Sequence, residues 1–234
     1  MLKAKDIMTA PVVTATPETT VREIAETLLK RHISAMPVVD EKNQVVGVVS
    51  EGDLIRRAEI GTDQRHRSWW LDLFADPAAE AADYAKSHGL RARDVMSRKV
   101  ITVGPDATLV DIAEILEKHH IKRVPVLENG RLAGIVSRAN LLQGLAMSAA
   151  KPLEAATADD NAIRERIVAA LAREPWASVG TTNVTVAKGV VEFWGTVGSA
   201  EEMRASRVLA EGVAGVKSVD DHRGLRPLAG TSGL

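Results

Sequence analysis

Hydrophobic and polar positions in the first quarter of the chain predict a short strand, a helix and a hairpin, in that order. Residues 12–14 form a β-branched run that ends at the turn 16–17. Over residues 21–33, apolar side chains recur at about the 3.6-residue spacing of an amphipathic helix. Two short apolar runs, 37–39 and 45–49, are separated by a polar turn and predict the hairpin.

The same pattern occurs twice. Residues 93–146 repeat residues 5–57, with one deletion in the hairpin turn, where a change of length costs little. The landmarks that recur in order are residues 6–8 and 94–96, 36–38 and 124–126, and 47–50 and 134–137. Each copy reads as β-α-β-β-α. A single copy is too small to bury its sheet alone, so we expect the two to pack as a pseudo-symmetric pair.

Helix-start signals support this reading. Thr20 with Glu23, and Thr108 with Asp111, have the three-residue spacing of a capping box. We therefore expect the first helix of each copy to begin just after these threonines.

The last third of the chain has a different pattern. An Ala-rich stretch, residues 146–158, predicts a linker, and the order beyond it is α-β-β-α-β, with Ser199 and Glu202 as a capping box of the second helix. The predicted elements are residues 160–173, 183–186, 190–197, 199–212 and 215–219, with a hairpin turn at 187–189.

Composition narrows the classes of function. The formal net charge is -1, and 45% of residues are hydrophobic, 26% charged and 3% aromatic. This balance is that of an ordinary globular protein and gives no indication of a nucleic-acid partner. The chain has no cysteine, which excludes thiolate nucleophiles and Cys-ligated metals. No dinucleotide fingerprint, P-loop, zinc-protease motif or nucleophile elbow occurs, so we expect no catalytic residues, no metal site and no enzyme activity.

The N-terminal segment lacks the pattern of a signal peptide, because Lys3, Lys5 and Asp6 interrupt its apolar residues. No apolar run approaches the roughly 18 residues of a membrane span. These observations lead us to expect a cytoplasmic protein.

The two copies resemble a CBS-domain pair (a Bateman module), which is common in regulatory proteins. The features that carry the resemblance are the Asp-Ile-Met start, the Pro-Val strand and the segment Gly-x-x-Ser-x-x-Asp/Asn. Residues 188–197 and 213–219 resemble a BON domain, a family associated with phospholipid or polymer contact. The implied fold class is α/β (α+β), with two CBS repeats followed by a small αββαβ domain.

The CBS resemblance implies a site for an adenosine ligand: AMP, ADP, ATP, NAD or S-adenosylmethionine. Asp53 would accept hydrogen bonds from ribose hydroxyls, and Ser50 would bond phosphate or ribose at a helix start. Gly47 would allow close approach of the backbone. The implied site residues are Thr14, Ala35, Met36, Pro37, Ser50, Asp53 and Arg56 in the first repeat, and Thr102, His120, Arg123, Val124, Pro125, Ser137 and Asn140 in the second. Arg56, Arg57, His120 and Arg123 are the candidate phosphate partners among the basic residues.

The second repeat departs from this pattern, because Asn140 stands where an aspartate is usual. An amide can accept from a hydroxyl but carries no charge. We therefore expect a weaker, different or empty second site. Ser50 with Asp53, and Ser137 with Asn140, are also good helix-cap arrangements that need no ligand.

The insert between the repeats contains Trp69, Trp70, Phe74 and Tyr84 at spacings that favour a helical hairpin, with a second helix ending near Gly89. Packing of these aromatic residues on the repeats or across a dimer is one interpretation. A lid or partner surface beside the basic run 65–67 is the other. The expected limits are 1–57 and 93–148 for the repeats, 58–92 for the insert, 149–159 for the linker, 160–228 for the BON domain and 229–234 for a tail.

The resulting functional hypothesis is a non-enzymatic sensor and homodimer that needs no cofactor. Adenosine-ligand binding would shift the packing of the CBS pair and change what the BON domain presents to a protein or phospholipid partner. The alternative is a protein that attaches to membrane or polymer through the BON domain, with the CBS pair as a dimerisation scaffold.

Overall fold

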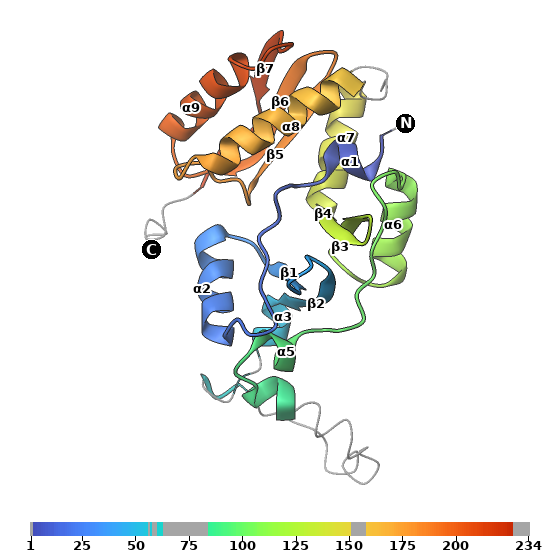
Figure 1. The fold of residues 1–234 in the computed structure, drawn as a ribbon, viewed down its shortest axis with the longest axis vertical. Coiled ribbons are helices and arrows are strands. Elements are labelled where there is room, and N and C mark those ends of the chain that lie inside the picture. The colour runs from blue at the N-terminus through green and yellow to red at the C-terminus, as the bar shows by residue number, and fades with distance from the viewer. Residues whose placement is uncertain (1, 56, 58–59, 63–83, 151–157, 227–234) are drawn as a thin grey trace, which may run out of the picture. The chain divides into compact units, whose positions relative to one another are not determined.

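A computed structural model describes residues 2–55, 57, 60–62, 84–150 and 158–226 (Figure 1). The chain divides into two compact units. One comprises Val13–Val100, and the other comprises Met1–Val12 together with Ile101–Leu234. The predicted domain limits stay a prediction, but the N-terminal twelve residues cluster with the second repeat rather than with the first.

The unit Val13–Val100 contains the first repeat from residue 13 onward. Its elements are α2 (Val21–Arg31), β1 (Ala35–Val39), β2 (Val45–Ser50), α3 (Glu51–Leu54) and α5 (Ala92–Val95). Strands β1 and β2 pair antiparallel, which confirms the hairpin. The predicted strand 12–14 is wrong as a strand: only a single parallel bridge, Ala15 to Val38, lies beside β1. The helix predicted after Ser50 is a single turn of four residues.

The second repeat has the same order of elements: α6 (Leu109–Lys118), β3 (Arg123–Glu128), β4 (Arg131–Ser137) and α7 (Arg138–Ala150). Strands β3 and β4 are antiparallel, and Val103 forms the parallel bridge to Val126. The N-terminal helix α1 (Ala4–Ile7) packs into the core of this repeat, where Ile7 is fully buried beside Ile112, Val124 and Val136.

Both capping boxes predicted in the two repeats are confirmed. The hydroxyl of Thr20 accepts from the Glu23 backbone N–H at 3.2 Å, and the Glu23 carboxylate accepts from the Thr20 N–H at 2.8 Å. Thr108 and Asp111 make the same reciprocal pair, at 3.2 and 3.3 Å. These bonds satisfy N–H groups that a helix start leaves without partners.

The C-terminal domain contains α8 (Ala158–Arg173), β5 (Thr182–Ala187), β6 (Val190–Val197), α9 (Ala200–Glu211), β7 (Ser218–Asp221) and β8 (Gly224–Leu225). The predicted order α-β-β-α-β is confirmed. Strand β6 pairs antiparallel with β5 and parallel with β7. Lys188 and Gly189, both with positive φ, form the two-residue hairpin turn.

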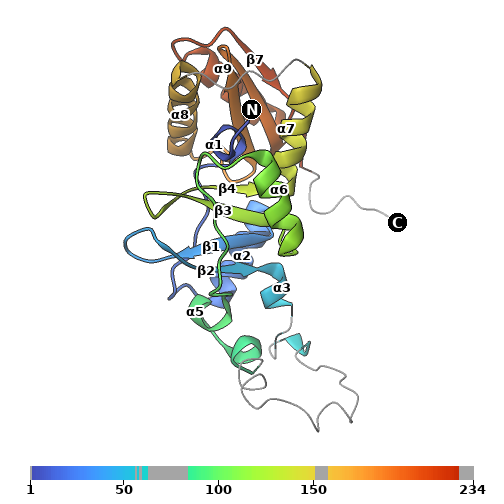
Figure 2. The same cartoon turned by 90° about the vertical axis from the view of Figure 1, so that its right-hand side faces the viewer.

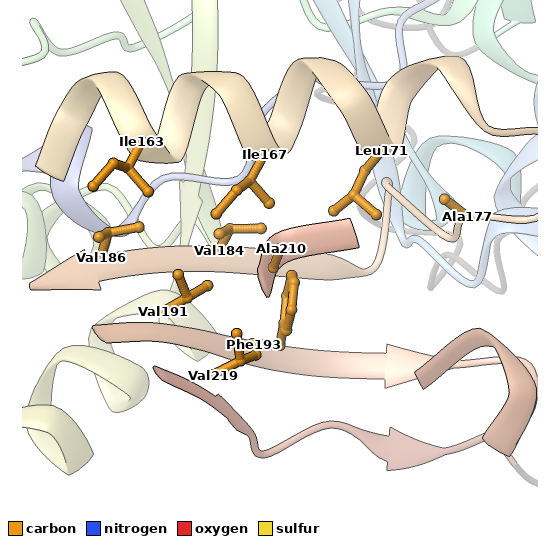
Figure 3. Close-up of a cluster of buried hydrophobic side chains, with 10 residues drawn as sticks. All are labelled: Ile163, Ile167, Leu171, Ala177, Val184, Val186, Val191, Phe193, Ala210 and Val219. Atoms are coloured by element: carbon orange, nitrogen blue, oxygen red, sulfur yellow. The ribbon is translucent and has the colours of Figure 1, made fainter. Parts of the chain in front are cut away.

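The core of this domain lies between the helices and one face of the sheet (Figure 3). From α8, Ile163, Ile167 and Leu171 point toward the sheet, and Phe193 on β6 is fully buried. The other face of β5 carries Asn183, Thr185 and Ala187, because successive side chains of a strand alternate between faces.

The capping box predicted at α9 forms only in part. The Ser199 hydroxyl accepts from the Glu202 N–H at 3.1 Å, as expected. The Glu202 carboxylate instead accepts from the backbone N–H groups of Ser178, at 2.6 Å, and Gly198, at 2.8 Å. Glu202 is buried, and these backbone hydrogen bonds, one from the loop before β5 and one from the loop before α9, satisfy its carboxylate.

A buried ion pair joins Asp221 and Arg223. The guanidinium Nη2 lies 2.6 Å from Asp221 Oδ2, and the two side chains are 5% (Asp221) and 1% (Arg223) exposed. Burial by itself would raise the pKa of Asp221, but hydrogen bonds and the charge of Arg223 outweigh it and hold the pKa below its ordinary value.

We expect Asp221→Asn to lower the free energy of unfolding by about 3 kcal/mol at neutral pH, because it leaves a buried arginine charge without its partner. Because the folded pKa is depressed, the pair stabilises fully above the unfolded pKa of about 4 and loses that contribution as pH falls through the folded pKa. Urea unfolding between pH 3 and 7 measures this, with the exposed neighbour Asp220→Asn as control. An Asp221→Asn deficit that does not shrink in acid would contradict the assignment.

Candidate functional site

In the first repeat, Ser50 and Asp53 meet where β2 runs into α3. The Ser50 N–H donates to Asp53 Oδ2 at 2.9 Å and the Ser50 hydroxyl donates to the same oxygen at 2.7 Å. Ala35 lies opposite Ser50 in the hairpin register, and the Glu51 N–H donates to the Ser34 carbonyl at 3.0 Å. The motif is therefore held at one end of the two-stranded sheet.

The second oxygen of Asp53 is less committed. Its Oδ1 lies 3.4 Å from Lys86 Nζ, and the Asp53 side chain is 14% exposed, so the carboxylate remains accessible. Nothing in the sequence pattern identified Lys86, because it lies 33 positions away in the insert. A partly exposed carboxylate whose outer oxygen has only a long contact to an ammonium group can accept from a diol, and the ammonium group can pair with a phosphate.

Other predicted site residues of the first repeat lie in or beside β1, some exposed and some in the core. Thr14 is exposed and precedes Ala15, whose N–H donates to the Pro37 carbonyl at 3.0 Å, so this segment lies beside β1. Ala35, Met36 and Pro37 are buried, and Met36 belongs to the hydrophobic core. Met36 is 1% exposed, so its role in this structure is packing of the core.

The candidate phosphate partners of the first repeat are Arg56 and Arg57. Arg56 lies outside the described residues. Arg57 is 4% exposed, and its Nη1 donates to the Lys86 carbonyl at 2.9 Å. Its side chain positions the segment that carries Lys86.

Gly47 and Gly134 occupy equivalent positions in the two repeats, and packing within the protein explains both glycines without a ligand. A Cβ at Gly47 would overlap the side chain of Met96, and a Cβ at Gly134 would overlap that of Met8. The segments Asp6-Ile7-Met8 and Asp94-Val95-Met96 thus each pack a methionine against the glycine of a hairpin, in the space that the missing Cβ leaves.

In the second repeat the Ser-x-x-Asn motif has the same local geometry but no spare polar atoms. Ser137 N and Oγ donate to Asn140 Oδ1 at 2.8 and 2.7 Å. Asn140 Nδ2 donates to the Ile7 carbonyl at 2.9 Å and approaches Thr9 Oγ1 at 3.3 Å and Gln143 Oε1 at 3.4 Å. Asn140 is 3% exposed. The acceptor expected for a ribose hydroxyl is already engaged within the protein.

The remaining positions of the second repeat are divided between core and surface. Thr102 precedes Val103, which bridges Val126, and Arg123 lies opposite Ser137. Val124 and Pro125 are buried in the same way as their counterparts in the first repeat. His120 is exposed and has a φ of 51°, a left-handed conformation just beyond α6 that ends the helix.

Of the aromatic insert, Trp69, Trp70, Phe74 and the basic run 65–67 lie outside the described residues. Tyr84 is 65% exposed and stacks on His88 with ring centroids 4.0 Å apart. The predicted end near Gly89 is confirmed, because the Gly89 N–H closes the turn on the Ala85 carbonyl at 2.8 Å.

Within the described ranges, no group of three potential metal ligands is found. In the same ranges, no helix combines the length and apolar character of a membrane span. The cytoplasmic location stays a prediction.

Comparison with known proteins identifies both parts of the chain. The family model for the CBS domain matches residues 4–59 and 92–146, and MJ1426 of Methanocaldococcus jannaschii is 32% identical over 151 residues, which are 60% of this chain and 89% of that protein. The chain belongs to the CBS-domain family. The family model for the BON domain matches residues 159–222, so this CBS-domain protein carries a BON domain after its CBS pair.

Two plant proteins are similar to the CBS pair, one in sequence and one in structure. Chloroplastic CBSX1 of Arabidopsis thaliana is 31% identical over 132 residues, covering 54% of this CBS-domain protein and 56% of CBSX1. The crystal structure of CBSX2 in complex with AMP is similar, with a TM-score of 0.55 and 26% identity over 63% of this chain and 98% of that one. The predicted family and the α+β fold are confirmed.

Proposed function

We propose that this protein is a non-enzymatic regulatory protein that binds an adenosine nucleotide through its first repeat. The observation that carries the proposal is the partly open Asp53 carboxylate, held by Ser50 and faced by Lys86. A carboxylate oriented by two hydrogen bonds, with its other oxygen accessible, suits the two hydroxyls of a ribose. The similarity to CBSX2, whose structure contains AMP, supports an adenosine ligand.

The regulatory role draws support from the diversity of the relatives. The matched region makes up only 14% of an A-adding tRNA nucleotidyltransferase of Aquifex aeolicus and 21% of an inosine-5'-monophosphate dehydrogenase of Halobacterium salinarum. A region shared by enzymes with such different activities cannot carry out both reactions, so a regulatory role explains its presence in both better than a catalytic one.

Calorimetric titration of the full chain with AMP, ADP, ATP, NAD and S-adenosylmethionine, with GMP as control, tests the proposal. Saturable binding of an adenosine ligand with one site per chain is the expected result, because the motif of the first repeat ends in a partly exposed carboxylate, whereas Asn140 of the second repeat is buried and engaged within the protein. Binding of none of them would overturn the proposal and favour the alternative, a BON-mediated attachment protein with the CBS pair as scaffold.

We also propose a homodimer, as the family resemblance implies. On the second repeat, Val110 of α6 and Leu142 and Leu145 of α7 are 59%, 66% and 64% exposed. Helices α6 and α7 contact each other, and exposed apolar residues on neighbouring helices are typical of an interface.

We expect light scattering to give twice the mass of one chain for the wild type and a monomer mass for Leu142→Glu, because a buried glutamate charge opposes association. Val208→Glu makes the same change at a position that is 65% exposed on α9 and should leave the dimer intact. A monomeric wild type would contradict the dimer.

A further inference from the structure

The carbonyl groups at the end of α1 are shared between two domains. The last carbonyls of a helix have no partner within it and must be satisfied from outside. The Ile7 carbonyl accepts from Asn140 Nδ2 of the second repeat at 2.9 Å and from Asn183 Nδ2 of the BON domain at 2.8 Å. The Met8 carbonyl accepts from Arg164 Nη2 of the BON domain at 2.6 Å.

Strand β5 presents Asn183 toward these carbonyls from the face opposite the BON core. Val184 and Val186 fill that core, whereas Asn183 points the other way and its Nδ2 also reaches Gln143 Oε1 of α7 at 2.8 Å. Figure 2 shows α8 and α7 on opposite sides of the BON sheet. Residues 182–186 are all buried, so both faces of this edge strand are covered.

Arg164 secures the same edge. Its Nε donates to the Val184 carbonyl at 2.8 Å, so one guanidinium bonds a carbonyl of β5 and the Met8 carbonyl together. The residue is 7% exposed, and burial lowers its pKa while the carboxylates of Asp6 and Glu165 oppose that change. Charged side chains at a sheet edge, and coverage of the edge by other segments, are usual ways to prevent unwanted strand pairing.

One polar atom in this contact is unsatisfied. Asn183 Oδ1 is buried and has no hydrogen-bond partner in the described part of the protein. Both hydrogens of its amide already have acceptors, so exchanging the oxygen and nitrogen would lose two bonds. A buried acceptor without a donor lowers the net stability that the docked arrangement gains from its hydrogen bonds.

We propose that the motif of the second repeat is a docking site for the BON domain of the same chain. Its elements are the Ile7 and Met8 carbonyls together with Asn140 and Gln143, and its occupant is the Asn183–Arg164 edge of the BON sheet. The asparagine at 140 fits this role. A carboxylate there would place an oxygen against the Ile7 carbonyl, whereas the amide donates to it. The proposal does not depend on nucleotide binding.

Distance measurement between two spin labels tests the docking. The chain has no cysteine, so Glu117→Cys on α6 and Glu211→Cys on α9, both exposed, give two unique label positions in the full-length protein. Labelled chains are diluted in excess unlabelled protein, so that a homodimer contributes only distances within one chain. Double electron–electron resonance without nucleotide should then give one narrow distance distribution for the otherwise wild-type chain.

Asn183→Asp and Arg164→Gln should each broaden that distribution and lower the docked fraction relative to the undocked one by about tenfold or more, because each removes hydrogen bonds to the carbonyls. Thr185→Val is the matched control: it lies on the same face of β5, its one bond (3.4 Å to Glu192) stays within the BON domain, and the distribution should stay narrow. Circular dichroism verifies that each variant is folded.

A broad distribution in the wild-type background, or a narrow one in both folded variants, would overturn the docking site. Because the measurement is made without nucleotide, either result leaves the titration of the first repeat to be judged separately.

Discussion

Asp53→Ala is expected to weaken binding of AMP by about 10- to 100-fold. A hydrogen bond to a charged group contributes about 1.5–3 kcal/mol, and each 1.4 kcal/mol is a tenfold change in affinity. Asp53 Oδ2 is already bonded to Ser50, so the loss would come from the Oδ1 edge that faces Lys86. Calorimetry with AMP measures the change.

Glu51→Ala is the matched control for this variant. Glu51 is an exposed acidic residue of the same short helix, so it tests whether loss of any nearby negative charge matters. We expect its AMP affinity to stay within about twofold of wild type, since an exposed charge contributes little. Equal affinities of wild type and Asp53→Ala would refute the assignment of Asp53 to the ribose.

Asn140→Asp is expected to destabilise the protein by about 3 kcal/mol at neutral pH. From the sequence alone, this change should restore the usual aspartate and strengthen adenosine binding at the second site. In the structure, it would instead bury a carboxylate with its oxygen against the Ile7 carbonyl, at a position that is 3% exposed.

The pH dependence of this variant gives a second criterion. Burial should raise the pKa of the new carboxyl, so the penalty is present above the folded pKa and disappears as pH falls to the unfolded value of about 4. Protonation also restores a donor toward Ile7. Urea unfolding at pH 7 and pH 4 measures both effects, and Asn129→Asp, the same change in an exposed turn, should be neutral. Stronger AMP binding with undiminished stability would show that the second site is open after all.

The sequence by itself determined the features that depend on short-range chemistry. Thr20 and Glu23 are three residues apart, the spacing at which side chains and N–H groups bond reciprocally when a helix begins between them. Lys188 and Gly189 form the hairpin turn because such a turn needs two positive φ angles. The family and the order of elements followed from the two copies in register, since a repeated pattern adds information that one copy lacks.

What a motif residue contacts was decided only in the tertiary structure. Asp53 and Asn140 occupy equivalent positions and make the same bonds to their own serines, so local sequence cannot separate them. The second terminal atom of each side chain has a different partner: Asp53 Oδ1 faces Lys86, whereas Asn140 Nδ2 donates to the Ile7 carbonyl.

These partners lie far from the motifs along the chain. The same is true of two other contacting pairs: Asn183 with Ile7, and Gly134 with Met8. Spacing and periodicity describe neighbours within a few residues, whereas burial and the pairing of polar groups depend on which distant segments pack together. For that reason the same serine motif leaves a carboxylate open in one repeat and engages an amide fully in the other.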